Sequence, residues 1–374
     1  MLIHKLIQKI ADLQNTADRR YFVEGIFESS RENNRWFYAR PDTNIFFTAL
    51  IVKSLQKNKD HFPVNSLPIV EEIIQKGIAN YPDFQNKDGL KTYNFFKTKP
   101  SQHFPNGHLL KRFEHFKIPD DADDTAFIYQ TLPHSQSDAL WLQQKLASHA
   151  NLSQKQNTHT FTEYKALKAY STWFGKNMYI EFDVCVLCNV LSCLLSFNLP
   201  LDQHGFDSLK YIKAVILSGQ HLSHPFKVAH QYPRSVLIIY HVVRFIDEFQ
   251  VADLEELRPI LIKNCLQLLS KRQHWLDEIL LLISLLKLDK NYQKQFRHTI
   301  NRIKSQIEES LVDKPDFGDF YYFIAGMLTA FENPFTYAFA KSKWFHIFWK
   351  CDAFNFVLML EFLVEIEKFE RSLK

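Results

Sequence analysis

Four aspartates stand within five positions of the chain, in the stretch KIPDDADDTAFIYQTL. They are Asp120, Asp121, Asp123 and Asp124. Carboxylates this close repel one another, so a fold keeps them only if a metal ion, a helix N-terminus or a bound proton takes up the charge. The cluster therefore predicts a metal site, a helix cap or a carboxylic acid that retains its proton near neutral pH.

The residues around the cluster predict a helix that begins at Asp120 or Asp121. Pro119 precedes it, and an aspartate at a helix start accepts hydrogen bonds from the free amides of the first turn. In such a helix Asp121 and Asp124 share one face, whereas Asp123 points about 100° away from Asp124. The spacing therefore separates one carboxyl group from the other two.

The hexapeptide DADDTA (121–126) resembles the D-x-D-D-T-A motif of class II terpene cyclases, a family that includes the squalene–hopene cyclases. The resemblance implies an α6/α6 barrel with the motif at one end of an apolar cavity. It also implies that Asp123 is the general acid, which protonates a C=C bond or an epoxide of an isoprenoid. Asp121 and Asp124 would support it. The implied reaction needs no cofactor, and Mg²⁺ would take part only if the substrate carries a diphosphate.

The physical chemistry of the cluster agrees with that role for Asp123. An acid that protonates an alkene must still hold its proton near neutral pH, and both an apolar cavity and adjacent carboxylates raise the pKa of an aspartate. The positive end of a helix acts in the opposite direction. The groups are expected to titrate as a coupled set.

The resemblance further predicts aromatic rings around the substrate, because π-faces stabilise carbocations. The chain is 15% aromatic and contains 34 phenylalanines. Candidate substrate contacts are Trp173 and Phe174 in the segment YSTWF, together with Phe127 and Tyr240. For each ring, ordinary core packing is the alternative role.

The chain also departs from the family pattern. In FQNKDGLKTYNF (84–95), Gln85 and Gly89 fit the family's Q-x-x-x-G-x-W repeat, but Lys91 stands where a tryptophan is expected. Squalene cyclases contain two barrel domains, and this chain has about half their length. It resembles the catalytic barrel domain alone, so the identity of the substrate does not follow.

A magnesium-dependent reading uses the same cluster differently. Asp120, Asp121 and Asp124 match the D-D-x-x-D pattern with which class I terpene synthases bind Mg²⁺ and a diphosphate. The second metal motif of those enzymes is not evident in the sequence. The proline before the cluster also favours a helix start over the mid-helix position that class I chemistry requires.

Two further readings stay open. Asp183 and Cys185, with His241 farther along, resemble the zinc ligands of protein prenyltransferase β-subunits, although the apolar run around Cys185 and Cys188 favours core thiols. The aspartates could instead form only a solvated acidic helix cap on a non-catalytic barrel that serves as a binding protein.

Bulk composition limits the classes of partner. The net charge of +4 comes from interspersed residues with no polybasic block, which argues against nucleic acid. Five cysteines without a disulfide pattern, no signal peptide and no long apolar run predict a cytoplasmic protein. Residues 1–15 form an amphipathic helix, which either docks on the body or makes a peripheral membrane contact.

Apolar residues recur at helical spacing along most of the chain, and no strand alternation of useful length is evident. The sequence predicts one all-α domain over residues 1–374, an α6/α6 barrel of about twelve helices. A long connection, 82–119, precedes the aspartates and is expected to be functional. Beyond the N-terminal helix, helices are expected at about 43–56, 68–81, 121–133, 135–150, 180–197, 204–220, 234–248, 252–271, 274–289, 291–310, 317–332 and 350–370.

Overall fold

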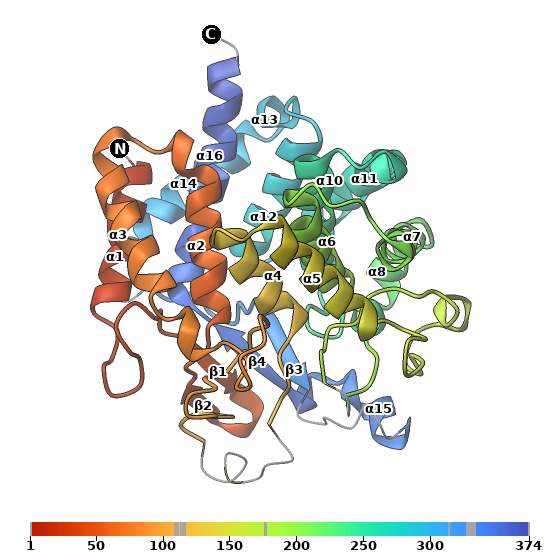
Figure 1. The fold of residues 1–374 in the computed structure, drawn as a ribbon. Coiled ribbons are helices and arrows are strands. Elements are labelled where there is room, and N and C mark those ends of the chain that lie inside the picture. The colour runs from red at the N-terminus through yellow and green to blue at the C-terminus, as the bar shows by residue number, and fades with distance from the viewer. Residues whose placement is uncertain are drawn as a thin grey trace.

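The structure is a computed structural model that describes residues 2–107, 112, 117–175, 178–312, 315–326 and 334–372. Most of these residues are helical (Figure 1). The helices are α1 (Leu2–Asn15), α2 (Phe46–Asn58), α3 (Leu67–Ile78), α4 (Ala122–Thr131), α5 (Gln136–Ser148), α6 (Val184–Ser196), α7 (Gln203–Leu217), α8 (Gln220–Ser223), α9 (Pro225–Val228), α10 (Ser235–Phe249), α11 (Arg258–Leu269), α12 (Trp275–Leu288), α13 (Tyr292–Gln295), α14 (Arg297–Glu309), α15 (Pro334–Ala340) and α16 (Asp352–Ser372). The prediction of a mainly helical chain is confirmed.

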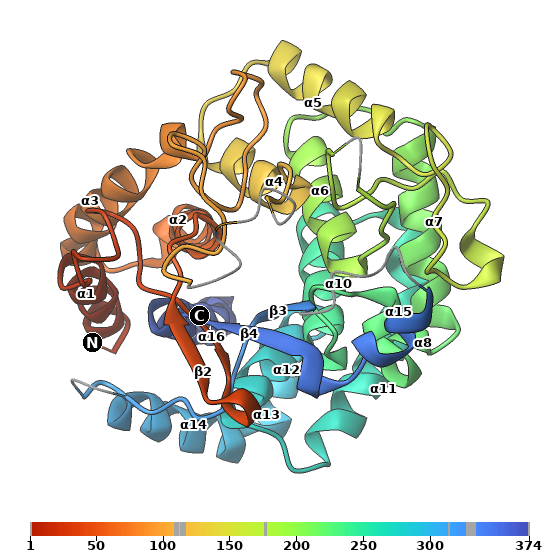
Figure 2. The ribbon, with the colours of Figure 1, turned by 90° about the horizontal axis from the view of Figure 1, so that it is seen from below.

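Within this part of the chain, six helices pack side by side in a closed ring. α2 contacts α4, α4 contacts α6, and the sequence continues through α10, α12 and α16 back to α2. Other helices lie outside: α3 packs on α2, α7 on α6, α11 on α10 and α12, and α1 on α16 (Figure 2). Along the chain, ring helices alternate with outer helices.

The sequence explains which helices lie inside. α12 buries nearly every residue from Leu276 to Leu286, because it is covered on most sides. The outer helix α14 buries only Ile300, Ile303 and Ile307, a single stripe at helical spacing. An all-round apolar segment therefore becomes a ring helix, and an amphipathic one covers the ring from outside.

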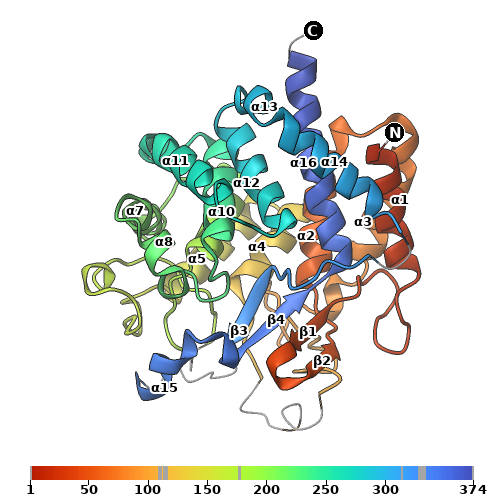
Figure 3. The same cartoon turned by 180° about the vertical axis from the view of Figure 1, so that it is seen from behind.

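A small antiparallel sheet, absent from the prediction, lies at the end of the ring where the ring helices begin (Figures 1 and 3). Its strands are β1 (Ser30–Asn33), β2 (Tyr38–Pro41), β3 (Phe323–Gly326) and β4 (His346–Lys350), in the order β2-β1-β4-β3. The helix predicted over 317–332 is wrong at 323–326, which form β3; residues 327–332 lie outside the described residues. Strands from the two ends of the chain thus pair with each other.

The N-terminal helix is docked on the body. The side chains of Ile3, Leu6, Ile7 and Ile10 are buried, and α1 packs on α16 and α3. The apolar face that could have met a bilayer is therefore covered by the protein itself. In the described part of the chain, no helix combines the length and apolar character needed to cross a membrane.

Candidate functional site

The aspartate cluster forms the start of α4, as the sequence predicted. Asp121 is the N-cap, and its Oδ1 accepts hydrogen bonds from the backbone N–H groups of Asp123 and Asp124, both at 2.8 Å. The hydroxyl of Thr125 donates to the backbone oxygen of Asp121 at 2.7 Å. One carboxyl group of the four therefore caps the helix, and the others have different surroundings.

Asp124 is fully buried, and neither of its carboxyl oxygens accepts a hydrogen bond from a donor in the described structure. Burial raises the pKa of Asp124 well above its usual range, and the neighbouring Asp121 and Asp123 carboxylates raise it further. The pKa of Asp121 is raised as well, chiefly by burial and by the charge of Asp123. These shifts favour the protonated form of Asp124, whose proton can be shared with the carboxyl group of Asp121.

The raised pKa of Asp124 predicts how the stability of the protein depends on pH. An aspartate with a raised pKa in the folded state binds a proton that the unfolded chain releases near pH 4, so its contribution to stability is lost as pH rises. Asp124→Asn cannot ionise. At pH 8 we therefore expect the free energy of unfolding of this variant to be about 1–3 kcal/mol higher than that of the parent, because only the parent must take up a proton or bury an unpaired carboxylate in order to fold. Urea unfolding of parent and variant at pH 5 and pH 8 measures the difference. If the free energy of unfolding changes by the same amount between the two pH values in both proteins, Asp124 does not hold the proton.

Asp120 is held by the long connection that precedes it. Asn86 Nδ2 and the hydroxyl of Thr92 donate to its Oδ2, and Asn94 Nδ2 lies 3.4 Å from its Oδ1. Segment 82–119 thus supplies hydrogen-bond donors to one carboxyl group of the cluster, as far as that segment is described. A functional role for this connection stays a prediction.

Asp123 points away from the cap and into the interior of the ring. Its Oδ1 accepts a hydrogen bond from Asn189 Nδ2 on α6 at 2.8 Å, and its Oδ2 accepts one from the hydroxyl of Tyr232, which precedes α10. Burial raises the pKa of Asp123 to about 6, although the hydrogen bonds from Tyr232 and Asn189 oppose the shift. This carboxyl group can exchange its proton near neutral pH while its two partners keep it in place.

A cluster of aromatic rings adjoins Asp123 through Tyr232. The ring of Phe46 is the centre: its centroid lies 4.7 Å from that of Phe323, 5.7 Å from that of Phe127 and 6.4 Å from that of Tyr232. The ring of Tyr322 stands edge-on to Tyr232 at 5.8 Å. Side chains from α2, α4 and the β3 strand therefore form one aromatic cluster, which meets the Asp123 carboxyl group through the hydroxyl of Tyr232.

The four aromatic residues predicted to contact the substrate lie in different surroundings. Phe127 belongs to the cluster around Phe46, and Tyr240 lies in the ring interior, where its hydroxyl donates to Glu361 at 2.5 Å. Trp173 and Phe174 approach the aspartates through their backbone, since residue 173 forms an isolated bridge with residue 121. The Trp173 indole N–H, however, donates to a glutamate, Glu181, at 2.8 Å.

The residues of the zinc hypothesis make other contacts in the structure. Asp183 is the N-cap of α6 and accepts backbone N–H groups from Cys185 and Gln231, each at 2.8 Å. Cys185 and Cys188 are buried in the core. Among the residues that the structure describes, no group of three or more His, Cys, Asp or Glu side chains is placed to hold a metal ion.

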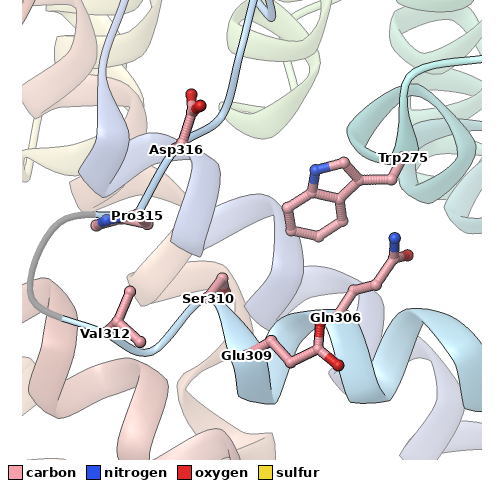
Figure 4. Close-up of a pocket in the computed structure, with 7 residues that line it drawn as sticks. All are labelled: Trp275, Gln306, Glu309, Ser310, Val312, Pro315 and Asp316. Atoms are coloured by element: carbon pink, nitrogen blue, oxygen red, sulfur yellow. The ribbon is translucent and has the colours of Figure 1, made fainter.

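A pocket of about 220 Å³ lies elsewhere, between the start of α12, the end of α14 and the segment before β3 (Figure 4). Its lining residues are Trp275, Gln306, Glu309, Ser310, Val312, Pro315 and Asp316. None of the candidate site residues belongs to this set, so the pocket is separate from the aspartate site.

Two partners of Asp123 escaped the sequence prediction. Asn189 is a lone amide in the apolar helix VCVLCNVLSCLLS, and a buried amide requires a hydrogen-bond partner. That rule could have marked Asn189 as a site residue. For Tyr232 the sequence carries no comparable signal, because nothing local distinguishes it from the other tyrosines.

The comparisons with known proteins add no family. No family model matches the chain, and no curated protein matches it. The resemblance to class II terpene cyclases therefore rests on the sequence motif.

Proposed function

We infer that the helices form an α6/α6 barrel. Three observations support this architecture: the ring of α2, α4, α6, α10, α12 and α16 closes on itself, ring and outer helices alternate along the chain, and the ring helices begin at the same end, beside the sheet. This is the fold that the resemblance to class II terpene cyclases implies, with the aspartate motif at one end of the barrel.

We propose that the protein is a class II terpene cyclase, which starts the cyclisation of an isoprenoid by protonating a C=C bond or an epoxide. The observation that carries the proposal is Asp123, a titratable carboxyl group buried in the ring interior, fixed by Asn189 and Tyr232 and adjoined by aromatic rings. A non-catalytic helix cap would not require a second carboxyl group turned away from the helix start.

In the proposed reaction, the Asp123 carboxylic acid gives its proton to one carbon of the double bond. The π electrons form the new C–H bond, and the other carbon becomes a cation that the next double bond attacks. Tyr232 and Asn189 stabilise the Asp123 carboxylate that remains. Rings such as Phe46 and Phe127 present π-faces to the migrating cation. The last cation loses a proton to water, and the Asp123 carboxylate takes one up from solvent, so the reaction is an isomerisation overall.

The pH dependence of such an enzyme follows from the pKa of Asp123. Catalysis requires the protonated acid, so kcat/KM should rise as pH falls and reach half its maximum near pH 6. Tyr232→Phe removes a donor that lowers this pKa, and the midpoint should move to higher pH by about one unit, the value of one hydrogen bond to a charged group.

Tyr170→Phe is the matched control, because the hydroxyl of Tyr170 also donates to an aspartate, Asp202, away from α4. Its pH profile should equal that of the parent. A midpoint that stays in place for Tyr232→Phe would show that Asp123 is not the titrating acid.

The proposal is tested by incubating the purified protein at pH 5.5–7.5 with farnesyl diphosphate, geranylgeranyl diphosphate and squalene, with and without Mg²⁺. Mass spectrometry of the extracts should show a cyclic isomer that retains any diphosphate of its substrate. Release of diphosphate that depends on Mg²⁺ would instead identify class I chemistry. Absence of turnover for every isoprenoid would favour the binding-protein alternative.

A further inference from the structure

The interior of the ring contains a layer of charges that Asp123 chemistry alone does not explain. α2 and α10 lie across the ring from one another (Figure 2), and the ammonium group of Lys57 reaches Glu248 at 2.6 Å to join them. One helical turn nearer the sheet, the corresponding residues are Lys53 on α2 and Arg244 on α10. The ion pair of Lys57 and Glu248 is thus followed, one turn along both helices, by two cations.

These two cations have no counter-ion of their own. Neither Lys53 nor Arg244 forms an ion pair or a hydrogen bond with any residue in the described ranges. Each instead lies against an aromatic ring: Lys53 Nζ is 5.1 Å from the centroid of Phe127, and Arg244 Cζ is 5.1 Å from that of Tyr240. Lys53 is only 6% exposed, so water cannot fully replace the missing partner.

The neighbouring acids are already engaged. Glu248 binds Lys57, while Glu361 accepts from Tyr240 and lies 3.8 Å from Lys287. The ammonium group of Lys287 also contacts Asp247 and Glu365. Asp123 is one helical turn before Phe127, and in its protonated form it carries no charge. The titratable groups that face this layer are therefore Lys57, Cys188, Cys193, Tyr240, His241, Glu248, Lys287, Tyr322, Glu361 and Asp123.

We propose that Lys53 and Arg244 form a binding site for a phosphate-type anion in the ring interior, beside Asp123. Two cations on facing helices match an anion that carries more than one charge and presents oxygens on several sides. The guanidinium group can bind two oxygens at once, and the ammonium group adds a compact charge. Arg244 is partly exposed, as are Lys57 and Glu248, so these side chains of the layer contact solvent at the end of the ring opposite the sheet.

Such an anion would also influence the acid. The charges of Lys53 and Arg244 lower the pKa of Asp123, and an anion bound between them would offset this effect and help Asp123 to keep its proton. Lys53 itself has a pKa lowered to about 7, by burial first and by Arg244 second, and the anion would raise it. On the basis of the proposed function, on which this step rests, the site selects an isoprenoid with a terminal phosphate or diphosphate over a neutral hydrocarbon.

The site is tested by titrating the whole protein with inorganic pyrophosphate at pH 7 and low salt in a calorimeter, in two buffers that differ in ionisation enthalpy. We expect saturable binding with uptake of protons by Lys53 and Asp123. Lys53→Met and Arg244→Met should each weaken binding about tenfold or more, the value of one charge-assisted contact. Lys57→Met, which removes a nearby cation that has its own partner, should have a much smaller effect.

Each outcome of these titrations either supports or overturns the anion site. No saturable binding, or equal losses in all three variants, would overturn the site, and acetate that binds as tightly as pyrophosphate would overturn its preference for phosphate. Lys53→Arg should restore binding, which guards against a variant that merely misfolds. Because no turnover is needed, pyrophosphate binding without isoprenoid cyclisation would refute the proposed reaction and leave the anion site standing.

Discussion

Asp123→Asn should reduce the formation of cyclic product by about 10²–10⁴-fold, the contribution that a positioned general acid makes to a reaction. Asparagine has nearly the shape of aspartate but no proton of comparable acidity. Its amide can still meet Asn189 and Tyr232, the two groups that bind Asp123 in the parent. The loss is therefore expected in kcat, with the thermal unfolding temperature close to that of the parent.

Asp202→Asn provides the comparison. Asp202 accepts a hydrogen bond from the hydroxyl of Tyr170 and caps the outer helix α7, so the substitution has the same chemistry outside the ring. Product yields from parent, control and Asp123→Asn are measured by mass spectrometry on the same substrate. Equal activity in Asp123→Asn and the control would remove Asp123 from the reaction and with it the proposed function.

Local signals were enough to predict most helices. The start of α4 was expected at Asp120 or Asp121 and is found with Asp121 as its N-cap. This agreement has a simple cause, because a proline followed by aspartates acts through neighbours in sequence. The same applies to α12, whose apolar run marks a helix covered on most sides.

The sheet could not be predicted in the same way. Its strands have only four or five residues, and β1 pairs with β4 across more than 300 positions of the chain. Aromatic residues around Phe323 have no decisive local preference, so the helical spacing of 317–332 was misleading there. What makes 323–326 a strand is the edge of β4, a partner that becomes visible only in the fold.

The candidate site, too, was predictable only where it depends on neighbours in sequence. The cluster of four aspartates is local and was evident from the sequence. The hydrogen bonds that hold Asp123 could not be predicted, since those from Asn189 and Tyr232 span 66 and 109 positions. These two partners distinguish Asp123 from Asp124, whose carboxyl oxygens accept no hydrogen bond from any residue that the structure describes. The fold therefore gives Asp121, Asp123 and Asp124 different partners and raises their pKa values to different extents.

The second large effect concerns a buried ion pair that joins β1 to the loop after β2. The side chains of Arg31 and Asp42 are fully buried and in contact. Arg31 also donates to the backbone oxygen of Pro105 at 2.7 Å, and Asp42 Oδ2 accepts from the indole N–H of Trp349 on β4 at 2.8 Å. The pair thus connects the sheet with the segment that leads to the aspartates.

Asp42→Ala should lower the free energy of unfolding by about 3–5 kcal/mol, because the guanidinium group of Arg31 would remain buried without its counter-ion. Urea unfolding near pH 7 measures the change. Asp18→Ala, which breaks the exposed pair with Arg20, is the control and should have a much smaller effect, because solvent already screens that pair. Equal losses in the two variants would mean that water reaches Arg31. The ring of Trp349 stacks on Phe323 at 5.3 Å, so the rings beside Asp123 depend on the same connection.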